Sequence, residues 1–244
     1  MTDPSPTPPV VLRVVLVVVG LGLWFLTQVL LRYRPDGAGV LGDGLHTLTA
    51  QLNDFLLANP RWADGLLIVS SLGIDVLGCF VLGYSVLGPS VRPFAGLMIL
   101  FFLRQVCQAL CALPPPKGMI WRSPGVPSLL VTYGTANDLF FSGHTALAVY
   151  GSIELGRWGG PAWAVVGVLI AAFEITAVLV LRAHYTMDVF AGAVTAFAAA
   201  VVATWIAPAC DHWLVELGQR IGLGHTGLLG AGSGPAHSDR PPPE

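Results

Sequence analysis

The sequence predicts an all-α, polytopic membrane protein built as a bundle of six transmembrane helices. Apolar residues make up 54% of its 244 residues and charged residues only 11%, and the mean hydropathy is +0.71. Soluble domains carry about 25% charged residues, so this deficit excludes an ordinary water-soluble domain. The apolar residues gather in six runs, and a helix needs about 20 such residues to cross a bilayer.

The first run, residues 10–31, follows a polar, proline-rich leader of residues 1–9 and ends at basic residues. It is too long for a cleaved signal peptide, so we expect it to remain as a membrane helix. The other five runs are bounded by proline, glycine or charged residues and are expected at residues 63–88, 93–113, 139–155, 161–181 and 185–207. Residues 10–207 then form one membrane domain, and the composition of residues 208–244 predicts a polar, disordered tail.

Two long polar connections separate these runs. Between residues 34 and 64, apolar residues recur at helical spacing and predict an amphipathic helix: Leu45, Leu48, Leu52, Phe55 and Leu56. Two interpretations stay open for this helix, a position in the membrane interface and an ordinary cap over the bundle. The second connection, residues 114–138, is punctuated by glycine and proline, and a loop of this length is usually functional.

A polar step interrupts the apolar run within residues 137–150. Ser142 is a favourable N-cap for a helix, and Gly143 lets backbone N–H groups approach a ligand closely. Such a helix terminus binds anions. His144 stands in the first turn, where it can give a proton to a bound anion or take one from it.

A second polar step precedes the sixth run. His184 and Asp188 are four residues apart and share one helix face, so the carboxylate can hold the imidazole. With six spans, His144 and His184 both begin even-numbered spans, and the parity of crossings places them on the same face of the membrane. The same count gathers four charged residues around them: Lys117, Arg122, Asp138 and Arg182.

This combination favours a phosphoryl-transfer site over the alternative that the histidines are ordinary interfacial anchors. His184 would attack phosphorus through one ring nitrogen while Asp188 accepts the hydrogen bond from the other. His144 would protonate the leaving alkoxide, and Asp138 would orient His144. We expect the phosphate oxygens to be bound by Ser142, Gly143, Arg182 and Arg104.

Other polar residues have less context. Asp75, Arg104 and Glu174 lie inside apolar runs, and both pairing with one another and a role in headgroup or proton handling are open. His46 has no comparable partner and is predicted to lie on the surface. The four cysteines lack metal-ligand spacing, so we expect neither a metal nor another cofactor. A net charge of −2 with scattered charges argues against a nucleic-acid partner.

The motifs resemble the type 2 phosphatidic acid phosphatase superfamily. Within it they are similar to the branch of sphingomyelin synthases and plant phosphatidylcholine:diacylglycerol cholinephosphotransferases. The resemblance rests on SGHT at 142–145, on HYTMD at 184–188, and on Arg104 followed by a Leu-Pro pair at 113–114. Together with the six-span layout it covers about residues 60–207.

The resemblance implies that His184 is a nucleophile forming a phosphohistidine, with His144 as acid and base and Asp188 as the group that orients the nucleophile. The phosphatases of the superfamily carry an arginine about six positions before the second histidine, where this sequence has Val178. Arg182 instead looks like the plant cholinephosphotransferase arrangement. This departure favours the transferase branch.

The implied function is a membrane lipid phosphotransferase that moves a phosphocholine-type or phosphoethanolamine-type headgroup to diacylglycerol or ceramide, with membrane lipids as donor and acceptor. The alternatives are a lipid-phosphate phosphatase and a non-enzymatic lipid-binding membrane protein. Basic residues are nearly balanced between the two faces, so the positive-inside rule does not set the orientation. The superfamily's sites generally face the extracytoplasmic or lumenal side, which implies cytoplasmic termini. No feature of the sequence predicts an oligomeric state.

Overall fold

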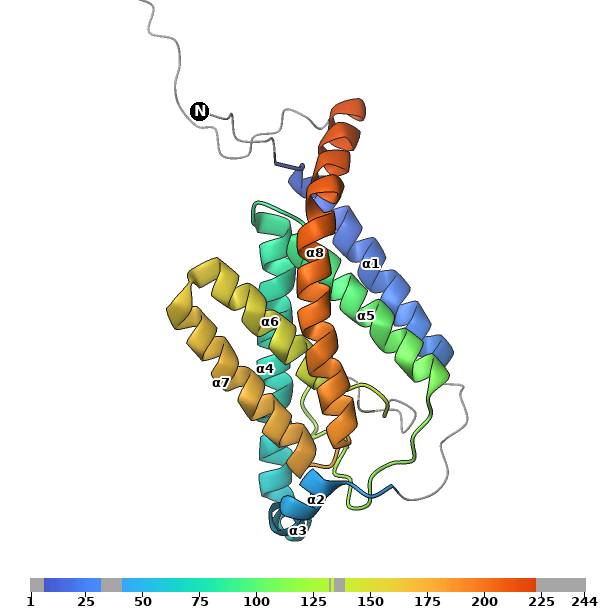
Figure 1. The fold of residues 1–244 in the computed structure, drawn as a ribbon, viewed down its shortest axis with the longest axis vertical. Helices are drawn as coiled ribbons and strands as arrows, with labels where there is room; N and C mark the ends of the chain where they lie inside the picture. Colours follow the sequence, from blue (N-terminus) through green and yellow to red (C-terminus); the bar gives the residue numbers. More distant parts are fainter. Residues whose placement is uncertain (1–6, 32–40, 132, 134–138, 223–244) are drawn as a thin grey trace, which may run out of the picture.

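The computed structural model describes residues 7–31, 41–131, 133 and 139–222. In these ranges the chain is helical without strands, which confirms the predicted all-α class (Figure 1). Six helices are long: α1 (Val10–Leu31), α4 (Pro60–Leu87), α5 (Arg92–Leu110), α6 (Gly143–Gly159), α7 (Pro161–Val180) and α8 (Thr186–Arg220). Two are short: α2 (Gly44–Leu48) and α3 (Ala50–Ala58).

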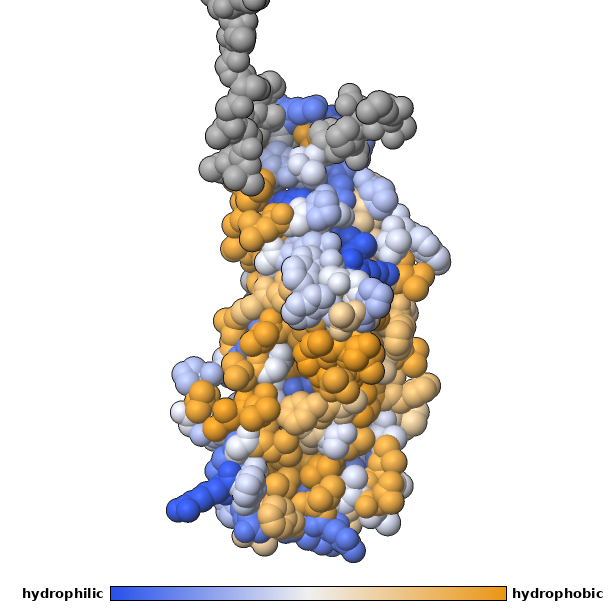
Figure 2. Space-filling view, turned by 90° about the vertical axis from the view of Figure 1, so that its left-hand side faces the viewer, coloured by the Kyte–Doolittle hydropathy of each residue, from blue (hydrophilic) through white to orange (hydrophobic). Residues whose placement is uncertain are grey.

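The long helices form a multi-pass membrane bundle. Within the described residues, five of them are long and apolar enough to cross a bilayer, and the sixth, α6, has 17 residues. Figure 2 shows apolar residues over the middle of the visible face, with hydrophilic residues gathered toward the two ends of the molecule. This face therefore has the apolar band that contact with a bilayer requires.

Successive long helices run in opposite directions (Figure 1). The ends of α5 and α7 therefore lie near the beginnings of α6 and α8, while the beginning of α1 and the end of α8 lie at the opposite end of the bundle. We call these the histidine end and the terminal end. This arrangement matches the one expected from the parity of crossings.

α6 lies in the middle of the bundle, in contact with α7, α8, α4 and α5. Most of its surface is covered by protein, which explains how it can be shorter and more polar than its neighbours. Two glycines let other helices approach it: a Cβ at Gly192 of α8 would lie 2.7 Å from the Ser142 carbonyl oxygen, and one at Gly167 of α7 would lie 2.8 Å from Ser152. The first contact joins the two histidine motifs.

The end of α8 lies beyond the predicted end of the sixth run. We expected the helix to stop at residue 207, but it continues through Arg220 across Pro208, so residues 208–220 are helical. The extension is fixed to the connection between α4 and α5, because Asp211 accepts hydrogen bonds from Ser90 Oγ at 2.6 Å and from the Val91 N–H at 2.9 Å. The rest of the predicted tail, 223–244, and most of the leader, 1–6, lie outside the described residues.

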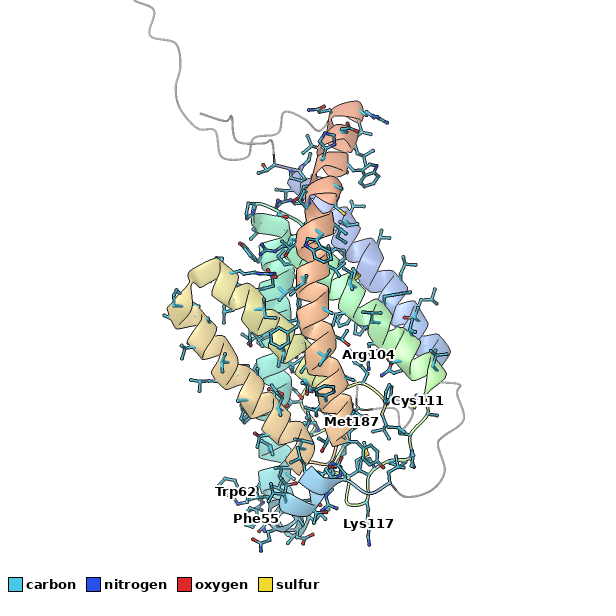
Figure 3. All side chains as sticks on the ribbon, viewed as in Figure 1. Phe55, Trp62, Arg104, Cys111, Lys117 and Met187 are labelled. Atoms are coloured by element: carbon cyan, nitrogen blue, oxygen red, sulfur yellow. The ribbon has the colours of Figure 1, made fainter. Side chains whose placement is uncertain are left out.

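α2 and α3 cover the histidine end of the bundle. Asn53 and Leu56 are buried against it, whereas Leu48, Leu52 and Phe55 are exposed by 79%, 55% and 50%. Figure 3 shows Phe55 at this outer edge. The segment is therefore a cap that is buried on one face against the bundle and exposes apolar side chains on the other.

Candidate active site

The histidine end encloses a cavity of about 60 Å³, and both predicted histidines, His144 and His184, line it. Gly143 and Arg104 lie in the same wall. The remaining lining is largely apolar and includes three large aromatic side chains from α1, α5 and the loop before α6: Trp24, Phe101 and Trp121. The sequence placed the histidines here, but no sequence signal pointed to α1 as part of the wall.

The Ser-Gly-His step forms the beginning of α6, as predicted. Ser142 is the N-cap, and its Oγ accepts a hydrogen bond from the Thr145 N–H at 3.3 Å. The Ser142 N–H donates to the carbonyl oxygen of Asp188 at 3.0 Å, so this cap is bonded directly to the first turn of α8. This bond joins the Ser-Gly-His step to the segment that carries His184 and Asp188.

Both motifs follow a strained backbone position. Phe141, just before the cap of α6, has φ 104°, and Arg182, two residues before His184, has φ 53°. Residues with a Cβ are disfavoured in this left-handed region, and such strain persists only where the surroundings hold it. The strain therefore marks both sides of the cavity as tightly determined backbone.

Gly143 has a different neighbour from the one expected. A Cβ at this position would lie 3.2 Å from Nε of Arg104, so the absence of a side chain lets the guanidinium approach the beginning of α6. Arg104 is 6% exposed, and Figure 3 shows it inside the bundle. A buried cation beside a helix N-terminus favours a negatively charged ligand in the cavity.

His184 and Asp188 face each other across the first turn of α8. Nδ1 of His184 is 3.6 Å from Oδ2 of Asp188, which is longer than a hydrogen bond. The same Oδ2 accepts from the Tyr185 N–H at 2.9 Å, and Asp188 is fully buried. Because Nδ1 is turned toward the carboxylate, Nε2 is the ring nitrogen left for a ligand.

His144 packs edge-to-face on Trp121, with ring centroids 5.2 Å apart. Trp121 in turn contacts Tyr133 at 4.9 Å, and the Tyr133 hydroxyl is hydrogen-bonded to Ser71 of α4. These contacts fix the imidazole against the cavity wall. Asp138, predicted to orient His144, lies outside the described residues.

Three of the predicted cations do not line the cavity. The Arg182 guanidinium donates to the carbonyl oxygens of Lys117 at 2.5 Å and His46 at 3.4 Å. Arg122 pairs with Asp64 at 2.7 Å on the surface. Figure 3 shows Lys117 at the outer edge of the histidine end. Arg104 is thus the arginine that the described structure places beside both histidines.

Asp75 and Glu174 do not pair with each other. Asp75 accepts hydrogen bonds from the backbone N–H groups of Leu129 and Leu130, both at 2.9 Å, and so holds the loop that lines the cavity. Glu174, fully buried, accepts from Ser70 Oγ at 2.6 Å. The two carboxylates therefore accept hydrogen bonds from different groups.

The prediction that His46 lies on the surface is wrong. It is 7% exposed, its Nε2 lies 2.9 Å from the carbonyl oxygen of His184, and its ring stacks on Tyr185 at 5.6 Å. Asp43, three residues earlier, caps α2 by accepting from the N–H groups of Leu45 and His46.

The described residues contain no group of three or more His, Cys, Asp or Glu side chains arranged to hold a metal ion. The polar groups at the cavity include two imidazoles, the Arg104 guanidinium, the Gln28 side chain and the amides at the beginning of α6. Such a set can bind a phosphate group and exchange protons with it.

A family model described as AtPDCT1/2, for the phosphatidylcholine:diacylglycerol cholinephosphotransferases, matches residues 43–205. A search of curated proteins found no match to the chain, and neither did a search of solved structures. The matched region is more than half of the chain, begins at the cap of α2 and includes both histidine motifs. The chain therefore belongs to the phosphatidylcholine:diacylglycerol cholinephosphotransferase family.

Proposed function

We propose that this chain transfers the phosphocholine headgroup of a phospholipid to diacylglycerol through a phosphohistidine on His184. The observation that carries the proposal is the shared cavity, which brings together His184 with Asp188, His144, Arg104 and the beginning of α6. Membership of the family supports a lipid donor and a lipid acceptor. The phosphohistidine intermediate is supported by the resemblance to the type 2 phosphatidic acid phosphatase superfamily, in which the corresponding histidine is the nucleophile.

In the first half-reaction, Nε2 of His184 forms a bond to phosphorus while the bond from phosphorus to the glycerol oxygen breaks. The leaving alkoxide takes a proton from His144 and departs as diacylglycerol. In the second, the hydroxyl of the incoming diacylglycerol gives a proton to His144 and attacks phosphorus, and the nitrogen–phosphorus bond breaks. Protons and charge then balance over one turnover.

Asp188 and Arg104 take different roles in this scheme. Asp188 orients the His184 ring and stabilises the positive charge that develops when Nε2 is phosphorylated. Arg104 and the amides of α6 stabilise the charge on the non-bridging phosphate oxygens, the main requirement in phosphoryl transfer. Arg182 is proposed to hold the backbone before His184, because its guanidinium is bonded to two carbonyl oxygens.

The aromatic wall supports a quaternary ammonium headgroup. Trp24 and Phe101 stack with ring centroids 4.5 Å apart, Trp121 packs edge-to-face on His144, and all three aromatic rings line the cavity. Aromatic rings bind quaternary ammonium groups through cation–π attraction. A choline-type headgroup fits such a wall better than a primary ammonium, which needs hydrogen-bond acceptors around it.

The direct test is a transfer assay in liposomes. Purified protein is given phosphatidylcholine and a fluorescent diacylglycerol, and the fluorescent phosphatidylcholine formed is measured. Transfer by the wild-type protein, absent in His184→Ala, is the expected result. If fluorescent product forms only when a fluorescent ceramide replaces the diacylglycerol, the acceptor is ceramide. Release of phosphocholine into water alone would indicate a hydrolase, and no reaction with any acceptor would leave a lipid-binding protein.

We also propose that the histidine end faces the extracytoplasmic or lumenal side and that the terminal end faces the cytoplasm. Ser123 is exposed in the loop before α6, and His212 is exposed on α8 near the terminal end. In a background without native cysteines, Ser123→Cys in intact cells should react with an impermeant maleimide and His212→Cys should not. Labelling of His212→Cys alone would reverse the orientation.

A further inference from the structure

The connection between α7 and α8, residues 181–185, carries His184, and the segment of α2 and α3 holds it from outside the cavity. Asn53 Nδ2 donates to the carbonyl oxygens of Val180 at 2.9 Å and Gly118 at 3.0 Å. At the other end, both oxygens of Asp43 bind Thr186, one the backbone N–H and one the hydroxyl, each at 2.6 Å. The connection is therefore fixed on both sides of His184.

His46 makes the contact nearest to the proposed nucleophile. Its Nε2 lies 2.9 Å from the carbonyl oxygen of His184. Because a carbonyl oxygen only accepts hydrogen bonds, Nε2 of His46 must carry a hydrogen and donate. The same ring stacks on Tyr185, and Arg182 donates back to the His46 carbonyl oxygen at 3.4 Å. His46 thus touches three of the residues in the connection.

The charge of Asp43 supports this arrangement. Partial burial works to raise the pKa of its carboxyl, but the hydrogen bonds from Thr186 and from the His46 N–H outweigh burial and hold the pKa below its ordinary value. The carboxylate therefore stays ionised at neutral pH. As an ionised acceptor it binds Thr186 more strongly than a neutral side chain would.

The left-handed backbone of Arg182 requires such support. This conformation is disfavoured for a residue with a Cβ, and Arg182 has φ 53°. The hydrogen bonds of Asn53, His46 and Asp43 determine the backbone on both sides of it. Without them the connection can relax, and His184 would move with it.

We propose that His46 is a positioning residue for His184: its Nε2–H fixes the carbonyl group of His184 and thereby the direction in which the His184 ring enters the cavity. This inference rests on the proposed role of His184 as nucleophile. His46 is not among the residues that line the cavity, so it acts through the backbone and not on the substrate.

The effect should fall on the rate of the chemical step. A displacement of about 1 Å in a reacting group lowers the rate by about 100-fold, whereas binding of the lipid depends on other residues. We therefore expect His46→Ala to lower kcat by about 10- to 100-fold with little change in KM. His46→Gln, whose amide N–H₂ can replace the Nε2–H donor, should recover most of the loss.

The test compares His46→Ala and His46→Gln with His212→Ala, an exposed histidine at the terminal end, in the transfer assay. Melting temperature in detergent is measured for each. Hydrogen–deuterium exchange of residues 181–188 gives a readout that does not depend on activity. The expected result is a lower kcat and faster exchange in His46→Ala, recovery of both in His46→Gln, and wild-type behaviour in His212→Ala.

Two results would overturn the positioning role. One is unchanged kcat together with unchanged exchange in His46→Ala. The other is an equal loss in His46→Ala and His46→Gln that follows the melting temperature, which indicates a role in overall stability. Failure of the proposed function is a separate outcome, since the wild-type protein would then lack transfer while the exchange measurement still reports whether His46 holds the connection.

Discussion

The two ends of the bundle bury charged residues in opposite ways. At the terminal end, Glu154 is fully buried and each of its oxygens pairs with an arginine, Arg92 at 2.8 Å and Arg157 at 2.7 Å. At the histidine end, Asp188 is equally buried, but among the described residues its Oδ1 has no hydrogen-bond partner and Nδ1 of His184 stays 3.6 Å away. The first carboxylate is fully used in holding the fold, and the second retains bonding capacity beside a cavity.

The buried arginines of the two ends lie in different surroundings. Arg13 donates to the carbonyl oxygens of Val86, in the last turn of α4, and of Gly88, its C-cap, and so closes a helix end. Arg104 lines the cavity beside Gly143 and His144. Both lie in helices that are long and apolar enough to cross a bilayer, where buried cations are costly unless they are satisfied. Their surroundings, and not their burial, distinguish a structural residue from a candidate for phosphate binding.

The largest expected effect is the loss of turnover when the proposed nucleophile is removed. His184→Ala should lower kcat by about 10⁴-fold or more, because it removes the proposed nucleophile. Melting temperature and membrane insertion should stay close to wild type, since the side chain makes no bond that spans the bundle. The transfer assay checks the rate, and wild-type turnover in a folded His184→Ala protein would end the phosphohistidine proposal. Asp188→Asn should lose less than His184→Ala, because it removes orientation and not the nucleophile.

A smaller effect is expected from separating the two motifs without changing either histidine. Gly192→Ala would place a Cβ 2.7 Å from the Ser142 carbonyl oxygen, so the beginnings of α6 and α8 must move apart by several tenths of an ångström or more. We expect kcat to fall by about 10- to 100-fold. Gly83→Ala in α4 is the matched control, because its Cβ would meet no atom within 4 Å. Equal activity of both variants would show that the approach of α6 to α8 does not set the site.

At the terminal end, a substitution of the buried carboxylate should lower the stability of the protein and leave its turnover nearly unchanged. Glu154→Gln leaves two arginines without their carboxylate, and breaking a buried pair costs about 3–5 kcal/mol. Arg92 and Arg157 are 25% and 31% exposed, so solvent screening lowers the expected loss to about 2 kcal/mol. The melting temperature should fall while kcat of the folded protein changes less than about twofold. A large loss of kcat at unchanged stability would contradict the division between the two ends.

Local sequence patterns were sufficient for most of the fold. Apolar runs located the long helices, and the starts predicted at Pro93 and Pro161 lie within one residue of the starts of α5 and α7. The prediction ended α8 too early, because composition alone cannot show that Asp211 docks against Ser90 and Val91. Such a contact depends on which loop the helix passes.

The candidate site likewise contains residues that the sequence predicted and residues that it did not. Ser142, His144, His184 and Asp188 were found because their spacing along a helix is visible in the sequence. The position of Arg182 was not, because its guanidinium reaches carbonyl oxygens of residues 65 and 136 positions away. His46 was missed for the same reason: its partner is a backbone carbonyl 138 residues later. Long-range bonds to the backbone leave no pattern in side-chain spacing.

The smallest expected effect is that of metal removal on transfer activity, and it tests which groups neutralise the phosphate at the histidine end. The described residues there offer two imidazoles, Arg104 and the amides of α6, but no set of three metal-ligating side chains. Arg104 and the amides are already assigned to the phosphate oxygens. Transfer activity in excess EDTA should therefore stay within about twofold of the untreated protein. If EDTA abolished activity and one particular divalent ion restored it, the ion would supply the charge neutralisation, and the histidines would act as ligands and not as nucleophile and acid.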